Sequence, residues 1–272
     1  MNASLGRALA LPLAPLLLWQ GRRVRRDTPR LPEAAGARTG CVARTRPGRP
    51  LRLLIVGDSS AAGVGAATQD DALAGCLARR LAPRLDGPLH WTLVARTGAS
   101  TRDALALLET TPPEPFDVAV VALGVNDATV LRPARRWLAD VEALTRRLHE
   151  RHRVCRVIWS GLPPMHRFPA LPQPLRGVLG LHARGLDAAL GRWCAGRPVG
   201  ASPQALHVPL PPMTGPSLAA SDGFHPGPAA YALWADALVP QVPEPAPRGG
   251  TGDAATAAAG TGRLPPSGSI AT

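Results

Sequence analysis

The sequence predicts an α/β protein, a three-layer α/β/α sandwich around a mostly parallel five-stranded sheet. Two observations favour this fold. Apolar runs typical of strands alternate with amphipathic helix patterns along residues 50–240. Several of these runs are apolar throughout, as expected for strands that are covered on both faces. Strands that alternate with helices form parallel sheets, because each helix carries the chain back across the sheet.

The strands are expected where short runs rich in Val, Ile and Leu occur. The run at 51–57 reads LRLLIVG and ends in glycine, and the run at 116–123 reads FDVAVVAL. Both have the length and the aliphatic content of buried strands. The other three strands are predicted at 89–95, 154–160 and 205–209.

Helices are expected between these strands because apolar residues recur there at intervals of three or four. Leu73, Leu77 and Leu81 show this spacing most clearly. The predicted helices span 70–85, 101–109, 133–150, 174–195 and 226–239. The third and the last begin at a proline, which suits the first turn of a helix.

The chain on either side of residues 50–240 has a different character. Residues 1–26 hold an apolar run, too short to span a bilayer, followed by arginines. This pattern predicts a membrane-surface or signal-anchor-like segment, with a helix packed on the domain as the alternative. Residues 27–49 are expected to be a linker and residues 241–272 a disordered tail. A cytoplasmic or membrane-associated protein is favoured, and an exported form stays open as an alternative.

The net charge of +12 raises the question of a nucleic-acid partner. Every basic residue is arginine, and the positive excess is spread over the presumed linker and several helix faces. A nucleic-acid site would gather basic residues in a stripe with interleaved aromatics, so no specific nucleic-acid partner is expected. The four cysteines lack CxxC spacing and a nearby histidine cluster, so no metal or organic cofactor is predicted.

The loop after the first predicted strand, residues 57–65, reads GDSSAAGVG. A glycine-rich turn at this place can bind phosphate, but the GxGxxG and GxxxxGK[ST] patterns are both absent. The alternative is a nucleophile turn, in which Ser59 lies at the carboxyl edge of the sheet. That edge is where open parallel sheets bind their ligands.

Three further loops are expected at the same edge. Gly98 either allows a turn with positive φ or presents an open backbone N–H to an oxyanion. Asn126 either caps a turn or donates its side-chain amide. Asp222 and His225 lie three residues apart, followed by a proline. The acid can therefore orient the imidazole, which would take the proton of Ser59.

The four blocks GDSSAAGVG, the Gly98 turn, GVND and DGFHP stand in one order along residues 51–240. In these blocks the chain resembles the SGNH or GDSL-type hydrolases, although Ser60 stands where the GDSL motif has leucine. The resemblance implies a flavodoxin-like fold and a serine ester hydrolase without a cofactor. It also implies a triad of Ser59, Asp222 and His225, and an oxyanion hole formed by Ser59, Gly98 and Asn126.

Residues 161–175 follow the fourth predicted strand and read GLPPMHRFPALPQPL. They are apolar, rich in proline and free of acidic residues, so we expect them to wall an acyl pocket. Leu162, Met165 and Phe168 are the expected substrate contacts, and a loop that merely packs on the sheet edge is the alternative.

The predicted function is cleavage of acyl or lipid esters or thioesters through an acyl-enzyme. A carbohydrate O-acetylesterase of the same fold is the first alternative, disfavoured by the single Tyr and three Phe of the chain. A basic membrane- or nucleic-acid-binding protein without enzymatic activity is the second. The predicted partners are a small-molecule or lipid ester and, through residues 1–26, a membrane surface.

Overall fold

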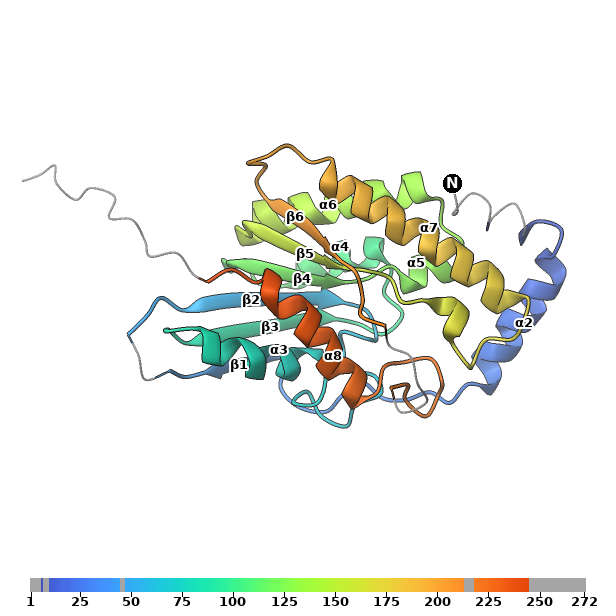
Figure 1. Cartoon of the computed structure of the whole chain (residues 1–272), viewed down its shortest axis with the longest axis horizontal. Coiled ribbons are helices and arrows are strands. Elements are labelled where there is room, and N and C mark those ends of the chain that lie inside the picture. The colour runs from blue at the N-terminus through green and yellow to red at the C-terminus, as the bar shows by residue number, and fades with distance from the viewer. Residues whose placement is uncertain (1–5, 7–9, 45–46, 213–217, 245–272) are drawn as a thin grey trace, which may run out of the picture.

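The computed structural model describes residues 6, 10–44, 47–212 and 218–244, and its centre is a six-stranded sheet (Figure 1). The strand order is β1-β3-β2-β4-β5-β6. The strands are β1 (Thr39–Val42), β2 (Leu51–Gly57), β3 (Leu89–Ala95), β4 (Val118–Ala122), β5 (Arg156–Ser160) and β6 (Gln204–Val208). All neighbouring strands are parallel except β1, which is antiparallel to β3.

Helices cover both faces of this sheet, and α2 (Ala14–Asp27) lies against α7 (Leu175–Ala195) at one end of the molecule. The other α-helices are α3 (Leu73–Leu81), α4 (Thr101–Thr110), α5 (Val125–Thr129), α6 (Ala134–His152) and α8 (Pro228–Leu238). Three short 3-10 helices also occur among the described residues: η1 (Ala82–Arg84), η2 (Met165–Arg167) and η3 (Val239–Gln241). The predicted α/β class is therefore confirmed.

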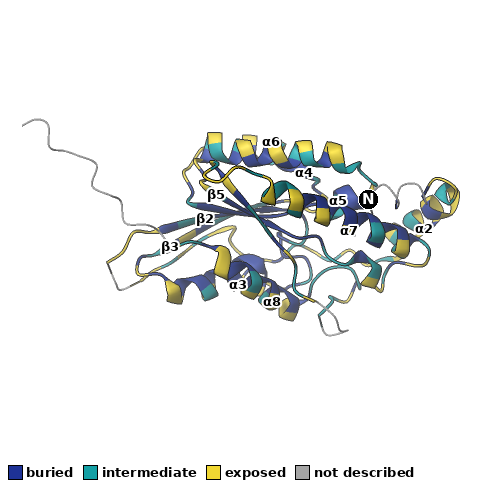
Figure 2. Ribbon diagram, turned by 45° about the horizontal axis from the view of Figure 1, so that its top comes forward, coloured by how far each residue is buried: buried dark blue, intermediate teal, exposed yellow. Residues whose placement is uncertain are grey.

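The three layers follow from the alternation of side chains along the strands. In β2, Leu53 and Ile55 belong to the core beneath α3 and α8. Leu54 and Val56 belong to a second core beneath α4, α6 and α7. Both cores are fully enclosed, as the dark central band of Figure 2 shows. Continuous apolar runs in the sequence were required because both faces of the strands are buried.

The prediction of five strands was one strand short. Strand β1 lies inside residues 27–49, which were predicted to be a linker, and it adds an antiparallel edge strand. Its four residues, TGCV, are too few to display a periodic pattern. Gly40 is needed there, because a Cβ at that position would lie 2.5 Å from Nε1 of Trp91 on β3.

Residues of both flanking segments pack against the domain. Helix α2 arises from the predicted N-terminal apolar segment, and its residues Leu17 and Gln20 are buried. Within the described ranges, none of the helices combines the length and the apolar character needed to cross a bilayer. Of the predicted disordered tail, residues 245–272 lie outside the described residues, whereas Val242 packs against the core beneath α8.

Candidate active site

Ser59 is placed by the sharp turn that ends strand β2. The backbone of Gly57 passes so close to β4 that a Cβ there would lie 2.7 Å from the carbonyl oxygen of Ala122. The N–H of Val64 donates to the carbonyl of Ser59 at 3.0 Å, which closes the turn. Ser59 is half-buried, at the carboxyl edge of the sheet. This is the edge at which the sequence predicted the chemistry.

Asp222 and His225 meet Ser59 from a turn just before α8. Oδ2 of Asp222 lies 2.5 Å from Nδ1 of His225, and Nε2 of His225 lies 2.9 Å from Oγ of Ser59. The turn is fixed by its own backbone, because the N–H of Ala220 donates to the carbonyl of His225 at 2.8 Å. Asp222 and His225 thus form one continuous hydrogen-bonded line with Ser59, which lies 166 residues before His225 in the sequence.

The ionisation of Asp222 decides which atoms of His225 carry protons. Burial alone would raise the pKa of Asp222, but hydrogen bonds from the His225 ring and from two backbone N–H groups outweigh it and hold the pKa below its ordinary value. An ionised carboxylate only accepts hydrogen bonds, so Nδ1 of His225 donates to it. Nε2 is then the acceptor, and the hydroxyl of Ser59 donates to it.

Asn126 and Gly98 occupy neighbouring loops at the same edge. Asn126 is the second residue of the short helix α5, which begins directly after Gly124, whose φ is +118°. Its Nδ2 donates to the carbonyl of Ala99 at 3.0 Å, which fixes the amide beside the Gly98 turn. Gly98 has a φ of +81°, and a Cβ built on it would meet nothing within 4 Å. The backbone of Gly98 therefore faces open space, and its role as an oxyanion donor, like that of Asn126, stays a prediction.

Asp58, directly before Ser59, is a buried acid that the sequence analysis did not single out. Its Oδ1 accepts from the N–H of Ser60 at 2.9 Å and from the Ser60 hydroxyl at 2.7 Å. Its Oδ2 lies 3.4 Å from Nδ2 of Asn126. Burial raises the pKa of Asp58, and the hydrogen bonds from Ser60 offset that effect only in part. The acid ties the Ser59 turn to the Asn126 loop.

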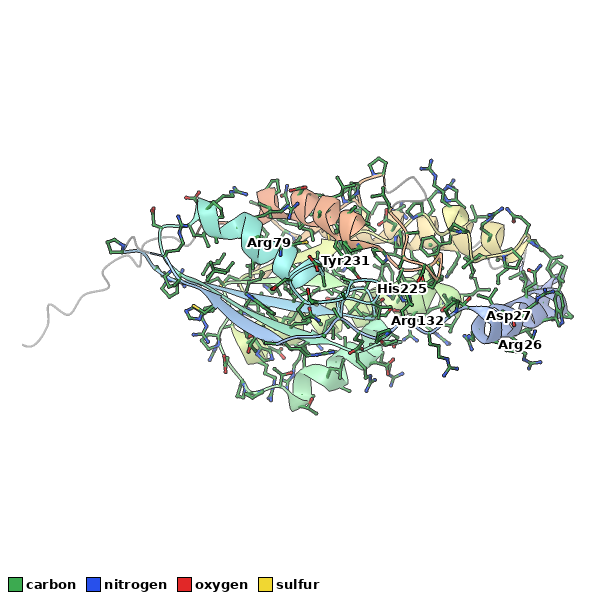
Figure 3. All side chains as sticks on the ribbon, turned by 90° about the horizontal axis from the view of Figure 1, so that it is seen from below. Arg26, Asp27, Arg79, Arg132, His225 and Tyr231 are labelled. Carbon is green, nitrogen blue, oxygen red and sulfur yellow. The ribbon has the colours of Figure 1, made fainter. Side chains whose placement is uncertain are left out.

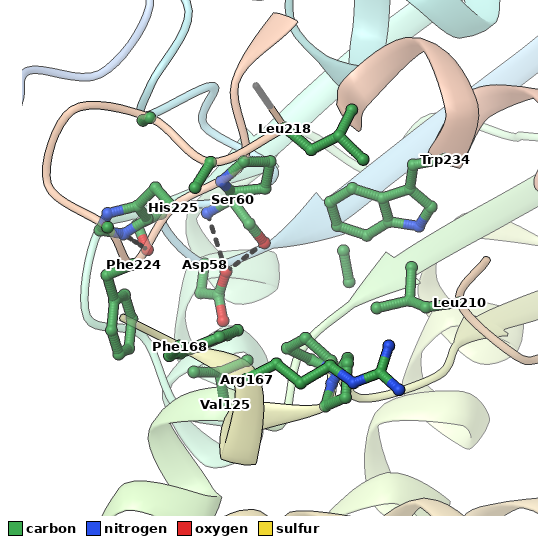
Figure 4. A pocket seen from close by; sticks show the side chains of 18 of the residues that line it. Asp58, Ser60, Val125, Arg167, Phe168, Leu210, Leu218, Phe224, His225 and Trp234 are labelled. Carbon is green, nitrogen blue, oxygen red and sulfur yellow. Dashed lines mark hydrogen bonds between the residues drawn. The ribbon is translucent and has the colours of Figure 1, made fainter. Parts of the chain in front are cut away.

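A cavity of about 560 Å³ opens beside Ser59 and His225, and most of its lining is apolar (Figure 4). Phe168, one of the predicted substrate contacts, lines it and stacks edge-on against Phe224 with ring centroids 4.9 Å apart. Further lining side chains are Val125, Pro164, Arg167, Leu210, Leu218 and Trp234. Nε1 of Trp234 donates to Oγ of Ser160 at 2.8 Å, which leaves its ring facing the cavity.

Leu162 and Met165, the other two predicted contacts, do not line this cavity. The N–H of Leu162 donates to Asp187 at 2.9 Å, and its side chain packs in the core beside Trp137 and Gly124. Met165 is fully buried because η2 lies directly on α7, where a Cβ on Gly180 would be 2.5 Å from the Cβ of His166. The predicted segment does wall the cavity, but through the residues on either side of these two apolar anchors: Gly161, Pro163, Pro164, Arg167, Phe168 and Pro169.

A second histidine–carboxylate pair lies nearby, and no serine among the described residues is hydrogen-bonded to it. Nε2 of His207 is 2.8 Å from Oδ1 of Asp187, next to Gly161. Among the described residues, no group of three or more His, Cys, Asp or Glu side chains is placed to hold a metal ion. The hydrogen-bonded line of Ser59, His225 and Asp222 sets a hydroxyl beside a proton acceptor, an arrangement suited to nucleophilic attack.

The chain is similar to known proteins in both sequence and fold. Residues 55–233 match the model of the GDSL-like lipase/acylhydrolase family. The chain is 33% identical over 226 residues to the GDSL-like esterase Rv1075c of Mycobacterium tuberculosis, a match that covers 76% of this chain and 68% of that protein.

Solved structures share the fold at low sequence identity. The lipase Lip_vut3 from a goat rumen metagenome is 17% identical, with a TM-score of 0.54, over 69% of this chain and 95% of that one. A G-D-S-L family lipolytic protein from Veillonella parvula is 14% identical, with a TM-score of 0.54, over 70% of this chain and 97% of that one.

Proposed function

The chain belongs to the GDSL-like lipase/acylhydrolase family, and from this premise we propose that it cleaves acyl esters through Ser59, His225 and Asp222. The observation that carries the proposal is the 2.9 Å contact between Oγ of Ser59 and Nε2 of His225, with Asp222 behind the ring. A carboxylic ester hydrolase needs such a nucleophile with its base already in place.

The proposed reaction has two halves. In the first, Oγ of Ser59 attacks the acyl carbonyl carbon while its proton moves to Nε2 of His225. The tetrahedral intermediate collapses when His225 returns that proton to the departing alcohol, and the acyl group stays on Ser59 as an ester. In the second half, His225 takes a proton from water, the hydroxide attacks the acyl carbon, and Ser59 leaves with the proton.

Asp222 stays ionised throughout and stabilises the imidazolium that forms on His225. The negative oxygen of the intermediate would be bound by the N–H groups of Ser59 and Gly98 and by the amide of Asn126. The 3.0 Å bond from Nδ2 of Asn126 to the carbonyl of Ala99 supports this assignment, because it orients the amide before the substrate arrives. The second N–H of that amide has only the longer 3.4 Å contact with Asp58, which the oxyanion would replace.

The lining of the cavity favours an apolar acyl group as the substrate. Phe168, Leu210, Leu218 and Trp234 surround a volume much larger than an acetyl group requires. An O-acetylesterase acting on carbohydrate would need little of that space on the acyl side, so a longer acyl ester fits the cavity better. Thioesters carry the same acyl group and are included in the proposed substrate class.

The test is hydrolysis of p-nitrophenyl esters of increasing acyl length by the purified chain. We expect Ser59→Ala to lower kcat/KM by at least about a thousandfold with the fold intact by circular dichroism. His225→Gln should do the same, whereas His207→Gln, the matched change in the second histidine–carboxylate pair, should keep most of the activity. A fluorophosphonate probe should attach to the peptide that contains Ser59. Labelling of another serine, or equal activity of Ser59→Ala, would refute the assignment.

A further inference from the structure

Exposed apolar side chains gather on and just before helix α2. Leu11, Leu16, Leu18 and Trp19 are 78%, 41%, 61% and 56% exposed. Among the described residues only three other large apolar side chains are exposed, and they lie far apart in the sequence: Val130, Val199 and Leu233. Figure 2 shows α2 as a largely exposed helix at the end of the molecule. Single exposed apolar residues need no explanation, but a cluster on one helix does.

The opposite face of α2 is firmly attached to the domain. Leu17 is buried in the core that also contains the first turn of α7. The side chain of Gln20 donates to the carbonyl of Gln173 at 2.7 Å and accepts from the N–H of Leu175 at 3.1 Å. The helix therefore has a fixed orientation, and its apolar face points away from the protein.

The last two turns of α2 are strongly basic. They carry Arg22, Arg23, Arg25 and Arg26, all exposed, and Asp27 as their one acid. Asp27 pairs with Arg23 and Arg26, whereas Arg22 and Arg25 form no salt bridge within the part of the chain that the structure describes. Figure 3 shows Arg26 and Asp27 at the end of the molecule formed by α2.

We propose that α2 binds the surface of a bilayer that contains anionic lipids. Leu11, Leu18 and Trp19 would enter the boundary between headgroups and acyl chains, and the unpaired arginines would bind headgroup phosphates. A helix with an apolar face and neighbouring arginines fits the chemistry of that boundary. Charge complementarity favours a lipid surface over a second copy of this chain, because two copies would bring equal basic clusters together.

The position of α2 links this surface to the cavity. Gln20 holds Gln173 and Leu175, the end of the same segment whose residues Pro164 and Phe168 wall the cavity. A chain bound through α2 would therefore carry its cavity wall close to the lipid. This last consequence rests on the proposed function, whereas the binding itself does not.

The experiment measures binding to vesicles with the Ser59→Ala protein, so that hydrolysis cannot alter the lipid. Vesicles of phosphatidylcholine alone are compared with vesicles that hold about one third phosphatidylglycerol. We expect binding to the anionic vesicles that weakens as salt is added. Arg22→Gln with Arg25→Gln should weaken it about 25-fold, since each arginine near such a surface contributes a factor of about five.

Matched controls distinguish binding through α2 from non-specific binding through other exposed apolar or basic side chains. The variant Leu11→Ser, Leu18→Ser, Trp19→Ser should lose most of the binding, while Val199→Ser with Leu233→Ser should not. Arg135→Gln with Arg136→Gln, an exposed pair on α6, should leave binding near the starting level. Thermal unfolding of each variant verifies that the fold is kept.

Three outcomes would overturn the inference. The first is no binding to anionic vesicles at low salt, and the second is an equal loss in the α2 and the control variants. The third is a dimer in light scattering that Leu11→Ser, Leu18→Ser, Trp19→Ser dissociates, because the apolar face would then join two copies. None of these bears on ester cleavage, which is measured separately with soluble esters.

Discussion

Asp222 contacts His225 at two atoms, the ring nitrogen Nδ1 and the backbone N–H, and it does so with different oxygens. Oδ2 lies 2.5 Å from Nδ1, while Oδ1 accepts the His225 N–H at 3.0 Å and the Phe224 N–H at 2.9 Å. One carboxylate therefore both shapes the turn and orients the imidazole. These two roles can be separated by substitution.

Asp222→Asn should lower kcat by about a thousandfold or more while the turn is kept. The amide oxygen can still accept the two backbone N–H groups, but its NH₂ group cannot accept the proton on Nδ1 of His225. Asp222→Ala should lose the turn as well and unfold at a lower temperature. The measurements are ester hydrolysis and thermal unfolding of both variants. Asp187→Asn is the matched control, and equal loss of activity in it would contradict the separate role of Asp222.

The stability of the protein should depend on pH through Asp222. Its pKa is below the ordinary value of 3.8, so the stabilisation from its charged form is fully present above that value and is lost as pH falls through the lower, folded-state pKa. The difference in unfolding free energy between wild type and Asp222→Asn should therefore shrink in acid. Urea unfolding from about pH 7 to about pH 2.5 measures it. A difference that stays constant would contradict the lowered pKa.

Asp58 should have the opposite effect on the pH dependence of stability. Burial raises its pKa above 3.8, so the folded state loses stability as pH rises from that value through the raised one. An asparagine cannot ionise, so Asp58→Asn should not lose stability in this way. Its unfolding free energy should therefore rise relative to that of wild type as pH rises. The same urea series tests this. The opposite trend, in which the unfolding free energy of wild type rises relative to that of Asp58→Asn as pH rises, would contradict the raised pKa. It would mean that the folded state stabilises the ionised carboxylate.

The cysteines offer a chemical test of burial. Cys41 and Cys155 are exposed, whereas Cys76 is buried and Cys194 is partly covered. Burial raises the pKa of both covered thiols, that of Cys194 to about 12, so little thiolate is available at neutral pH. A disulfide reagent such as Ellman's should react quickly with Cys41 and Cys155 and slowly with the other two until the protein unfolds. Peptide mapping assigns the fast sites, and rapid modification of Cys76 would contradict the packing of α3.

Much of the sheet and of the Ser59 turn could be predicted because local sequence determines them. The buried strands β2 and β4 need continuous apolar residues, and Gly57 is required where β2 passes Ala122. Strand β1 could not be predicted, because four residues give no period and their partner, β3, lies about fifty residues later.

The cavity was harder to predict than the Ser59 turn. The apolar, proline-rich composition of the segment after β5 predicts a cavity wall but does not show which of its apolar side chains face inward. Leu162 and Met165 anchor the segment because Asp187 and α7 hold it at those points. Trp234 and Leu210 lie far along the chain from this segment, and only the folded arrangement brings them to the same cavity as Phe168.

Leu210 should set the length of acyl chain that the enzyme accepts. Figure 4 shows it with Trp234 on the side of the cavity away from His225, so a larger side chain there would fill the far end and leave Ser59 free. Leu210→Trp should therefore reduce kcat/KM for long p-nitrophenyl esters by at least about tenfold and leave the acetate ester nearly unchanged. Leu233→Trp, the same change at an exposed position on α8, should alter neither. A uniform loss over all acyl lengths would place the acyl chain elsewhere, because a blocked far end cannot hinder an acetyl group.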